Sequence, residues 1–178
     1  MNNFIFISGG PCTGKTSVIN ELKENGYNTV PEAAREISAN DLRFAGKSIR
    51  DIDMRIFQNE IFNLQKRQIE SLIGKKEFFF FDRGFGDTLA YRKLHGFDTP
   101  HDFFDYAGKF QKSMVFILEP LGFYKTDELR TETREEQKEI HEKIISAYRE
   151  LKHPITFVPL MNTNKRAEFI IQKTLKGT

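Results

Sequence analysis

Hydrophobic residues in this sequence follow two patterns that alternate along the chain. In the first pattern they form short unbroken runs, such as Phe78 to Phe81, which are typical of strands buried on both faces of a parallel sheet. In the second pattern they recur at steps of three and four positions, as between Ile49 and Ile73, which indicates helices with one buried face. The runs, together with one shorter segment, predict five strands: Asn3–Ser8, Asn28–Val30, Phe78–Phe81, Met114–Leu118 and Ile155–Val158.

Local end signals help to delimit the helices between these strands. Asn25-Gly26 is a typical helix stop, and Pro31 suits the first turn of a helix. Thr133 and Glu136 have the spacing of a capping box, in which each side chain bonds the other residue's backbone. The predicted helices are Lys15–Glu24, Pro31–Phe44, Ile49–Ile73, Gly84–Leu94, His101–Phe110, Thr133–Leu151 and Lys165–Leu175.

The alternation of strands and helices predicts an α/β fold of three layers, with helices on both faces of a central, mostly parallel, five-stranded sheet. The length of 178 residues suits a single domain over residues 1–178. No repeat or low-complexity linker divides the chain. Because ligands of such sheets bind at the carboxyl ends of the strands, the residues that directly follow each strand are the candidates for chemistry.

The strongest of these candidates is the segment after the first strand, which reads Gly-Gly-Pro-Cys-Thr-Gly-Lys-Thr. A glycine, four residues and then Gly-Lys-Thr, placed between a strand and a helix, is the pattern of a phosphate-binding loop (Walker A). Its backbone N–H groups and the following helix start can surround phosphate oxygens, Lys15 can reach the outer phosphates, and the Thr16 hydroxyl can ligate Mg²⁺. The expected nucleotide-binding residues are Gly9, Gly10, Pro11, Cys12, Thr13, Gly14, Lys15, Thr16 and Ser17.

The third strand ends in Asp82-Arg83, which is a second candidate. An acid after four apolar residues matches the strand that holds Mg²⁺ in proteins with a phosphate-binding loop, although a buried strand can also simply end in a solvated acid. ATPases that hydrolyse nucleotide usually place Glu next. Arg83 stands there instead, and arginine suits a bidentate grip on phosphate or on the oxygens of an acceptor.

Three further residues are candidates for binding an acceptor molecule. Glu32 and Arg35 are three residues apart and share a helical face at the mouth of the second strand. A surface ion pair is the alternative explanation for these two residues. Tyr124 can stack on a base or ring, although such an aromatic residue more often simply packs.

A polar, densely charged segment precedes the helix predicted to begin at Thr133. Its position between the fourth strand and that helix predicts a lid over about residues 122–137. Arg130 and Arg134 can close over the phosphates and neutralise charge on the transferred group. A solvated charge run with local pairing is the alternative.

Charge, the length of apolar runs and the cysteine count limit which partners and which cell compartment are expected. A net charge of +2 gives no reason to expect nucleic-acid binding, and no apolar run is long enough to span a bilayer. A single cysteine, Cys12, cannot form an internal disulfide, which fits a reducing cytoplasm. Cys12 can be a reactive thiolate in its loop or a small residue that fills a tight turn.

Several motifs together resemble the family of small AAA-type ATP-binding proteins, which is similar to the nicotinamide riboside kinase domain of bifunctional NAD-synthesis proteins and to nucleoside and nucleotide kinases. The resemblance implies a P-loop NTPase fold of kinase type, with Asp82 beside the acceptor hydroxyl and Mg²⁺ and with Arg83 gripping an anion. An acid pair after the third strand is absent, which argues against a ring-forming motor. The motifs that carry the resemblance are Gly9–Ser17, Glu32–Arg35, Asp82–Gly84, Asp87 with Ala90–Tyr91, and Thr126–Arg130.

The expected function is that of a kinase, a phosphotransferase that uses ATP and Mg²⁺ and acts on a small hydroxyl-bearing metabolite such as a nucleoside or riboside. The alternative is a regulatory ATP-binding or ATPase module that acts through a protein partner. The sequence leaves open which acceptor is used and whether the chain forms an oligomer. The residues expected to contribute to catalysis are Lys15, Asp82, Arg83, Arg130 and Arg134.

Overall fold

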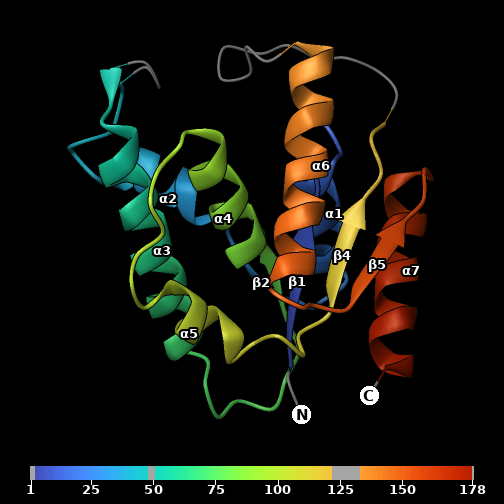
Figure 1. Cartoon of the computed structure of the whole chain (residues 1–178). Coiled ribbons are helices and arrows are strands. Elements are labelled where there is room, and N and C mark those ends of the chain that lie inside the picture. Colours follow the sequence, from blue (N-terminus) through green and yellow to red (C-terminus); the bar gives the residue numbers. More distant parts are fainter. Residues whose placement is uncertain (1–2, 48–50, 122–132, 178) are drawn as a thin grey trace.

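The computed structural model describes residues 3–47, 51–121 and 133–177. Its centre is a five-stranded sheet in which all neighbouring strands are parallel, in the order β2-β3-β1-β4-β5 (Figure 1). The predicted parallel sheet is therefore confirmed. The strands are β1 (Phe4–Ser8), β2 (Asn28–Val30), β3 (Phe79–Asp82), β4 (Val115–Leu118) and β5 (Ile155–Val158).

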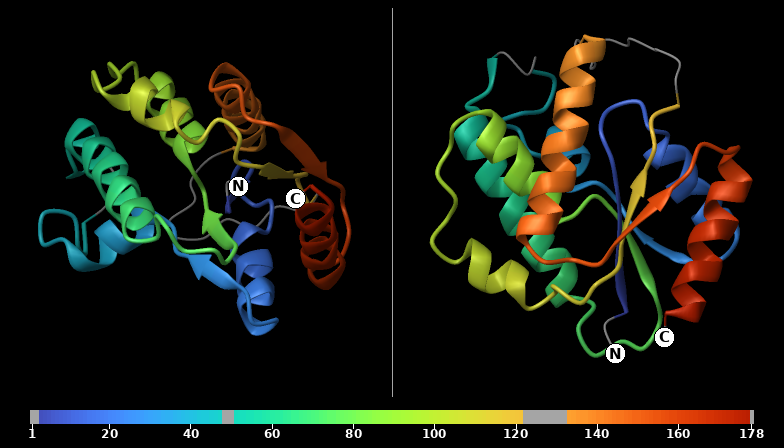
Figure 2. Two further views of the ribbon diagram at one scale, coloured as in Figure 1. Left: turned by 90° about the horizontal axis from the view of Figure 1, so that it is seen from below. Right: turned by 45° about the vertical axis from the view of Figure 1, so that its right-hand side comes forward.

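Helices cover both faces of this sheet, as the alternating pattern predicted. Helices α1 and α7 lie on one face, and α3, α4 and α6 lie on the other (Figure 2). The helices are α1 (Lys15–Glu24), α2 (Ala33–Asn40), α3 (Met54–Glu70), α4 (Phe85–Leu94), α5 (Phe103–Gly108), α6 (Arg134–Glu150) and α7 (Thr163–Lys176).

The core consists of two layers, one on each side of the sheet, because successive strand residues point to opposite faces. Phe4 and Phe6 of β1 pack with the helices of the α4–α6 side, whereas Ile5 and Ile7 pack with α1 and α7. Every residue of β1, β3 and β4 is buried. At about 1.5–3 kcal/mol for each large apolar side chain taken from water, these strands hold the sheet between its helices.

Helices α2 and α3 are shorter than the hydrophobic pattern predicted. Helix α2 ends at Asn40, and Phe44 beyond it packs back on the buried Phe57 of α3, with ring centroids 5.1 Å apart. Helix α3 begins at Met54 because the Asp53 side chain accepts hydrogen bonds from two N–H groups of the first turn. The pattern extended both helices because apolar residues in the flanking loops also pack on the core.

Three other helix starts differ in how well they match the prediction. Thr133 and Glu136 form the predicted capping box at the start of α6. Helix α7 begins two residues earlier than predicted, because Asn162 caps it by accepting from the Lys165 N–H. Pro31 lies one residue before the N-cap of α2, Glu32, and not within the first turn of the helix.

Candidate functional site

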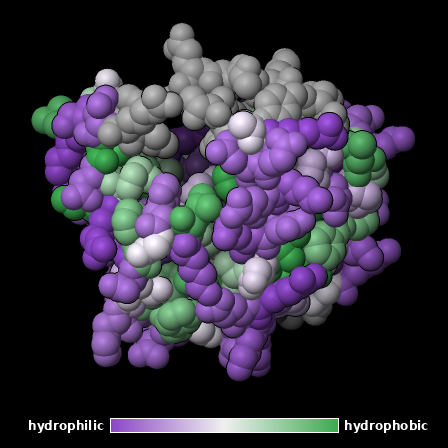
Figure 3. Space-filling model, turned by 45° about the horizontal axis from the view of Figure 1, so that its top comes forward, coloured by the Kyte–Doolittle hydropathy of each residue, from purple (hydrophilic) through white to green (hydrophobic). Residues whose placement is uncertain are grey.

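The parallel sheet brings three candidate segments to one edge. The loop after β1, Glu32 after β2 and Asp82 at the end of β3 all lie at the carboxyl ends of adjacent strands (Figure 1). The register pairs Ile7 with Asp82, so the acid lies beside the end of β1, close to where the loop begins. Seen toward this end, the molecule presents a mostly hydrophilic surface (Figure 3).

The loop between β1 and α1 has the backbone that its glycines permit. Gly9 and Gly14 have φ angles of 134° and 82°, which residues with a Cβ rarely adopt, and Gly14 is the N-cap of α1. A Cβ on Gly9 would lie 2.8 Å from the Leu118 carbonyl oxygen of β4. The loop therefore wraps the start of α1 closely, with the positive end of the helix dipole at its centre.

Two side chains from distant helices hold this loop from outside. The Arg166 guanidinium of α7 donates to the Thr13 and Glu119 carbonyl oxygens at 2.7 and 2.9 Å. The Gly10 N–H donates to Nδ1 of His141 in α6 at 3.0 Å. Burial lowers the pKa of His141, which favours the neutral ring that this hydrogen bond requires.

The Lys15 ammonium lies inside the loop to which it belongs. It donates to the carbonyl oxygens of Gly9 and Gly10 at 2.8 and 2.7 Å, and the residue is 7% exposed. Burial, together with the nearby Arg83, lowers the pKa of Lys15 to about 7. A phosphate that enters the loop can therefore replace two neutral carbonyl partners with an anion.

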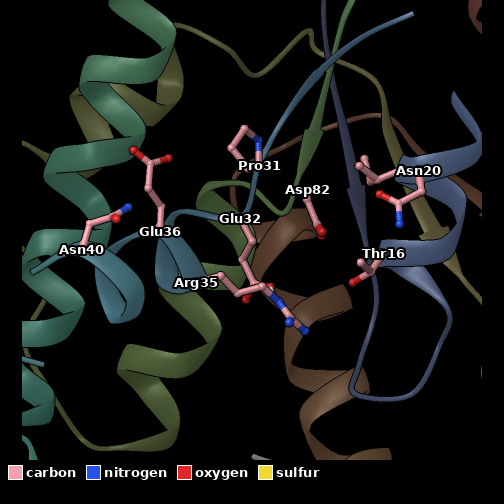
Figure 4. Close-up of a pocket in the computed structure, with 9 residues that line it drawn as sticks. Thr16, Asn20, Pro31, Glu32, Arg35, Glu36, Asn40 and Asp82 are labelled. Atoms are coloured by element: carbon pink, nitrogen blue, oxygen red, sulfur yellow. Dashed lines mark hydrogen bonds and ion pairs between the residues drawn. The ribbon is translucent and has the colours of Figure 1, made fainter. Parts of the chain in front are cut away.

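Asp82 and Thr16 face each other across the end of the sheet (Figure 4). Asp82 is 6% exposed, and its buried Oδ1 has no hydrogen-bond partner in the part of the chain that the structure describes. Burial and the Glu32 carboxylate raise the pKa of Asp82 to about 6. An unpartnered carboxylate oxygen near an exposed hydroxyl is a donor set that suits Mg²⁺.

In the part of the chain that the structure describes, the side chains do not form a complete metal site of their own. Within residues 3–47, 51–121 and 133–177, no group of three His, Cys, Asp or Glu side chains can hold an ion. Mg²⁺ in phosphate-transfer sites usually takes one or two protein oxygens and completes its shell with water and substrate phosphates. Thr16 and Asp82 therefore fit a metal that arrives with a nucleotide.

Glu32 connects the two candidate arginines. Its Oε1 accepts from Arg83 Nε at 2.8 Å and its Oε2 accepts from Arg35 Nε at 2.9 Å. Burial alone would raise the pKa of Glu32, but Arg83 and Lys15 hold it below its usual value. The ion pair between Glu32 and Arg35 is present, with the Arg35 side chain 56% exposed, and Glu32 connects it to the more buried Arg83.

Asp87 forms the hub of that network, a role that the sequence motifs did not reveal. Its carboxylate accepts from Ser8 Oγ at 2.8 Å, from the Gly84 N–H at 3.0 Å and from Tyr148 OH at 2.7 Å. It also pairs with Arg83 Nη1 at 3.1 Å. Asp87 thus ties the end of β1, the turn after β3 and helix α6 together.

Arg83 is held in an unusual backbone conformation. Its φ is 73°, in the left-handed region that costs a residue with a Cβ about 1–2 kcal/mol. Its N–H donates to the Ile7 carbonyl oxygen at 3.0 Å, and its guanidinium is bound by Glu32 and Asp87. These contacts fix the arginine near Lys15, and the predicted grip of Arg83 on phosphate or on an acceptor stays a prediction.

A cavity of about 510 Å³ lies next to Thr16 and Asp82, between α1 and α2 (Figure 4). Its size is within the range of small-molecule sites, roughly 300–1,000 Å³. Its lining residues are Thr16, Ile19, Asn20, Pro31, Glu32, Arg35, Glu36, Asn40 and Asp82. The structure thus places Glu32 and Arg35 in one cavity with both predicted metal ligands.

The predicted lid falls partly outside the described residues. Tyr124 and Arg130 lie in residues 122–132, of which the structure gives no description. Arg134 is the first residue of α6 and is exposed. Ser17 is exposed on α1, and Cys12 is partly exposed in the loop, where Gln137 Nε2 lies 3.7 Å from its Sγ.

The comparisons with known proteins agree with this architecture. Residues 4–166 match a protein family described as an AAA domain. The match spans most of the chain, from β1 to the first turns of α7. The resemblance that the sequence motifs carried is therefore confirmed at the level of the family. No curated protein matches the sequence of this chain.

Three solved structures with a similar fold are kinases. Shikimate kinase from Acinetobacter baumannii, in complex with shikimate, is 18% identical, with a TM-score of 0.57 over 99% of this chain and 94% of that one. Shikimate kinase from Aquifex aeolicus is 16% identical, with a TM-score of 0.59 over 98% and 96%. Thymidylate kinase from Ehrlichia chaffeensis is 15% identical, with a TM-score of 0.62 over 96% and 97%. At these identities the likeness shows a shared fold.

Within residues 3–47, 51–121 and 133–177, no helix combines the length and the apolar composition needed to cross a bilayer.

Proposed function

The chain belongs to the AAA domain family, and from that premise we propose that it transfers the γ-phosphate of ATP to a hydroxyl group of a small molecule. The observation that carries this proposal is the position of Asp82. Its unpartnered, buried carboxylate oxygen lies where the phosphate-binding loop meets the cavity between α1 and α2. One carboxylate can therefore serve both the nucleotide side and the acceptor side of the transfer.

On the nucleotide side, the loop and the start of α1 bind the phosphates of ATP. Backbone N–H groups and the helix dipole favour the negative charge, and the Lys15 ammonium exchanges its carbonyl partners for phosphate oxygens. Thr16 and Asp82 would hold Mg²⁺, which neutralises phosphate charge when it is bound with ATP. The chain's own contribution is to place fixed positive charge where the transferred group carries its negative charge.

On the acceptor side, Asp82 can accept the proton of the reacting hydroxyl. With a pKa of about 6, the carboxylate is ionised at pH 7. This pKa is also near the working pH, as a general base requires. The hydroxyl oxygen forms a bond to the γ-phosphorus while the bond from that phosphorus to the bridging oxygen breaks. The hydroxyl proton goes to an Asp82 oxygen, and ADP leaves with the bonding electrons.

The arginines have different roles in this proposal. Arg83 is fixed by Glu32 and Asp87, so it acts as a stationary positive charge beside Lys15. Arg130 and Arg134 are proposed to stabilise the transferring group from the lid segment at residues 122–137. Substrate contacts are proposed for Glu32, Arg35 and Tyr124.

The cavity also bears on the alternative of a regulatory ATP-binding module. Such a module needs no second small-molecule site, so a closed or wholly apolar pocket beside Asp82 would have favoured it. The cavity is instead of metabolite size, and six of its nine lining residues are charged or carry a side-chain amide: Asn20, Glu32, Arg35, Glu36, Asn40 and Asp82. This lining supports transfer to a bound acceptor.

The test is an acceptor screen with the purified chain. Nucleosides, nucleotides, vitamin-derived ribosides and hydroxylated carboxylic acids are incubated with ATP and Mg²⁺, and phosphorylated product is detected by mass. We expect product from at least one acceptor and none from the Asp82→Asn variant. ATP hydrolysis that proceeds at the same rate with and without every acceptor, and yields no phosphorylated product, would contradict the proposal.

A further inference from the structure

We propose that the cavity between α1 and α2 selects a polyhydroxylated acceptor that carries no anionic group, an inference that rests on the proposed phosphotransferase function. Three carboxylates line the cavity, from Glu32, Glu36 and Asp82. Among the lining residues that the structure describes, Arg35 is the one cation. A phosphate or carboxylate placed there would meet more negative than positive charge at short range.

The two arginines at the cavity, Arg35 and Arg83, are already paired with carboxylates. Arg35 and Arg83 each donate their Nε to a different oxygen of Glu32, and Arg83 also pairs with Asp87. The side chain of Glu32 is only 12% exposed, and that of Asp87 is 3% exposed. An anion that displaced either arginine would remove one of the two cations paired with Glu32, and displacement of Arg83 would also remove the cation paired with Asp87, so the exchange is unfavourable.

The polar groups that remain available in the cavity favour hydroxyl groups. Glu36 keeps one oxygen for a ligand, because Oε2 accepts from Gln68 Nε2 at 3.1 Å. Asn20 and Asn40 reach the same space from α1 and α2 (Figure 4). Carboxylate oxygens only accept hydrogen bonds, and amides both donate and accept. An acceptor with several hydroxyls can donate to the acids and accept from the amides at once.

Bound ATP strengthens this selectivity. Its phosphates lie on the far side of Asp82 in the proposed function, so a second anion in the cavity would face them as well as the three carboxylates. Kinases that phosphorylate an anionic acceptor need unpaired cations to offset that repulsion. Here Arg35 donates its Nε to Glu32, and its remaining N–H groups can still donate to hydroxyl oxygens.

The experiment measures binding separately from turnover. The probes are matched pairs: uridine and uridine 5′-monophosphate, thymidine and thymidine 5′-monophosphate, and shikimate methyl ester and shikimate. Dissociation constants are measured by calorimetry with the full chain, Mg²⁺ and a non-hydrolysable ATP analogue, and product is followed in parallel with ATP. We expect at least one uncharged probe to bind, and each such probe to bind at least roughly tenfold more tightly than its anionic partner.

The variant Glu36→Gln provides the matched test of the charge argument. It removes one lining charge but keeps an amide able to bond Gln68, so the preference for the uncharged probe should fall by a factor of roughly three to ten. Glu24→Gln removes the same charge from the exposed last turn of α1, outside the cavity, and should leave the preference unchanged.

The outcomes separate this inference from the proposed function. Selective binding of uncharged probes without any phosphorylated product would contradict the phosphotransferase function and leave the cavity's selectivity intact. Phosphorylation of a nucleotide or of shikimate in preference to its uncharged partner would support the function and overturn the selectivity. Failure of every uncharged probe to bind, or an unchanged preference in Glu36→Gln, would also overturn it.

Discussion

Lys15 is the residue through which the proposed binding of phosphate can be tested by pH. Its ammonium is buried against two carbonyl oxygens, and burial lowers its pKa to about 7. Contact with phosphate favours the charged form and raises that pKa again. Above a pH of about 7 the empty loop therefore holds a largely neutral lysine, which must take up a proton when ATP binds.

The affinity for ATP should fall as the pH is raised from about 7.5 to about 9, by up to roughly tenfold per pH unit. This range lies above the phosphate's own titration near about pH 6. Calorimetry in two buffers of different ionisation enthalpy should detect proton uptake on binding. Lys15→Met should bind ATP more weakly and without this pH dependence, and an affinity that rose with pH in the wild-type chain would contradict the assignment.

Asp82→Asn tests the proposed general base, a carboxylate whose ionised form is disfavoured by burial. Phosphoryl transfer should fall by roughly 10²–10⁴, the usual contribution of a general base, while ATP affinity should change less. In the wild-type chain, transfer should decline as the pH falls through about 6, because protonation then removes the carboxylate. Single-turnover transfer at several pH values measures both effects.

The stability of this variant provides the control. Because burial raises the pKa of Asp82, the ionised carboxylate costs folding free energy above about pH 6, and a neutral amide does not carry that cost. The melting temperature of Asp82→Asn at neutral pH should therefore equal or exceed that of the wild-type chain. A large loss of stability would show that lost activity came from unfolding instead.

At the scale of elements, the Tyr148 hydroxyl joins the C-terminal part of α6 to the network around Asp87. Tyr148 donates to Asp87, which in turn holds Arg83 and Ser8. Tyr148→Phe keeps the ring and removes this hydrogen bond to a buried carboxylate, so unfolding free energy should fall by about 1–3 kcal/mol. Transfer should fall as Arg83 loses its fixed position, with little change in ATP affinity.

Tyr106→Phe is the matched control for that prediction. Within the part of the chain that the structure describes, its hydroxyl makes no hydrogen bond to a site residue, and it can donate to the Lys66 carbonyl oxygen at 3.3 Å or to Glu70 Oε1 at 3.2 Å. The same chemical change there should leave transfer unaffected. Denaturant unfolding and steady-state kinetics of the two variants separate a structural contribution from a positioning one. Equal kinetic effects in both variants would refute the Asp87 connection.

The proposed role of the lid segment can be tested by removing its positive charges. Arg130→Gln and Arg134→Gln should leave ATP affinity nearly intact, because the loop supplies most of the phosphate contacts. At least one should reduce transfer steeply, by up to the roughly 10³–10⁵ associated with a catalytic arginine, and we expect the larger effect at Arg130. If the double variant kept most of its single-turnover rate, the segment would be a solvated charge run.

At the scale of the whole molecule, the order of the strands creates the site. The order β2-β3-β1-β4-β5 inserts β3 between β1 and β2, although β3 follows both in the chain. Asp82 is thereby placed between the phosphate-binding loop on one side and Glu32 on the other. Without that insertion, the acid, the lysine and the acceptor cavity would not share one edge.

The sequence by itself determined the features that depend on local chemistry. Unbroken apolar runs such as Phe79 to Phe81 specify strands buried on both faces, because only a covered sheet shields both sets of side chains from water. The spacing of Gly9, Gly14 and Lys15 specifies the phosphate-binding loop, because the required backbone angles and charge lie within eight residues. The capping box of Thr133 and Glu136 located the start of α6 for the same reason.

Only the tertiary structure decided how distant polar side chains meet. Asp87 is a hub because Ser8 and Tyr148 arrive from β1 and α6, and His141 and Arg166 hold the loop from helices that follow it by more than a hundred residues. The strand order, the pairing of Arg83 with Glu32, and the cavity have the same origin. A hydrogen bond or ion pair needs its atoms within about 3 Å, and a sequence does not state which distant residues satisfy that distance until the sheet is assembled.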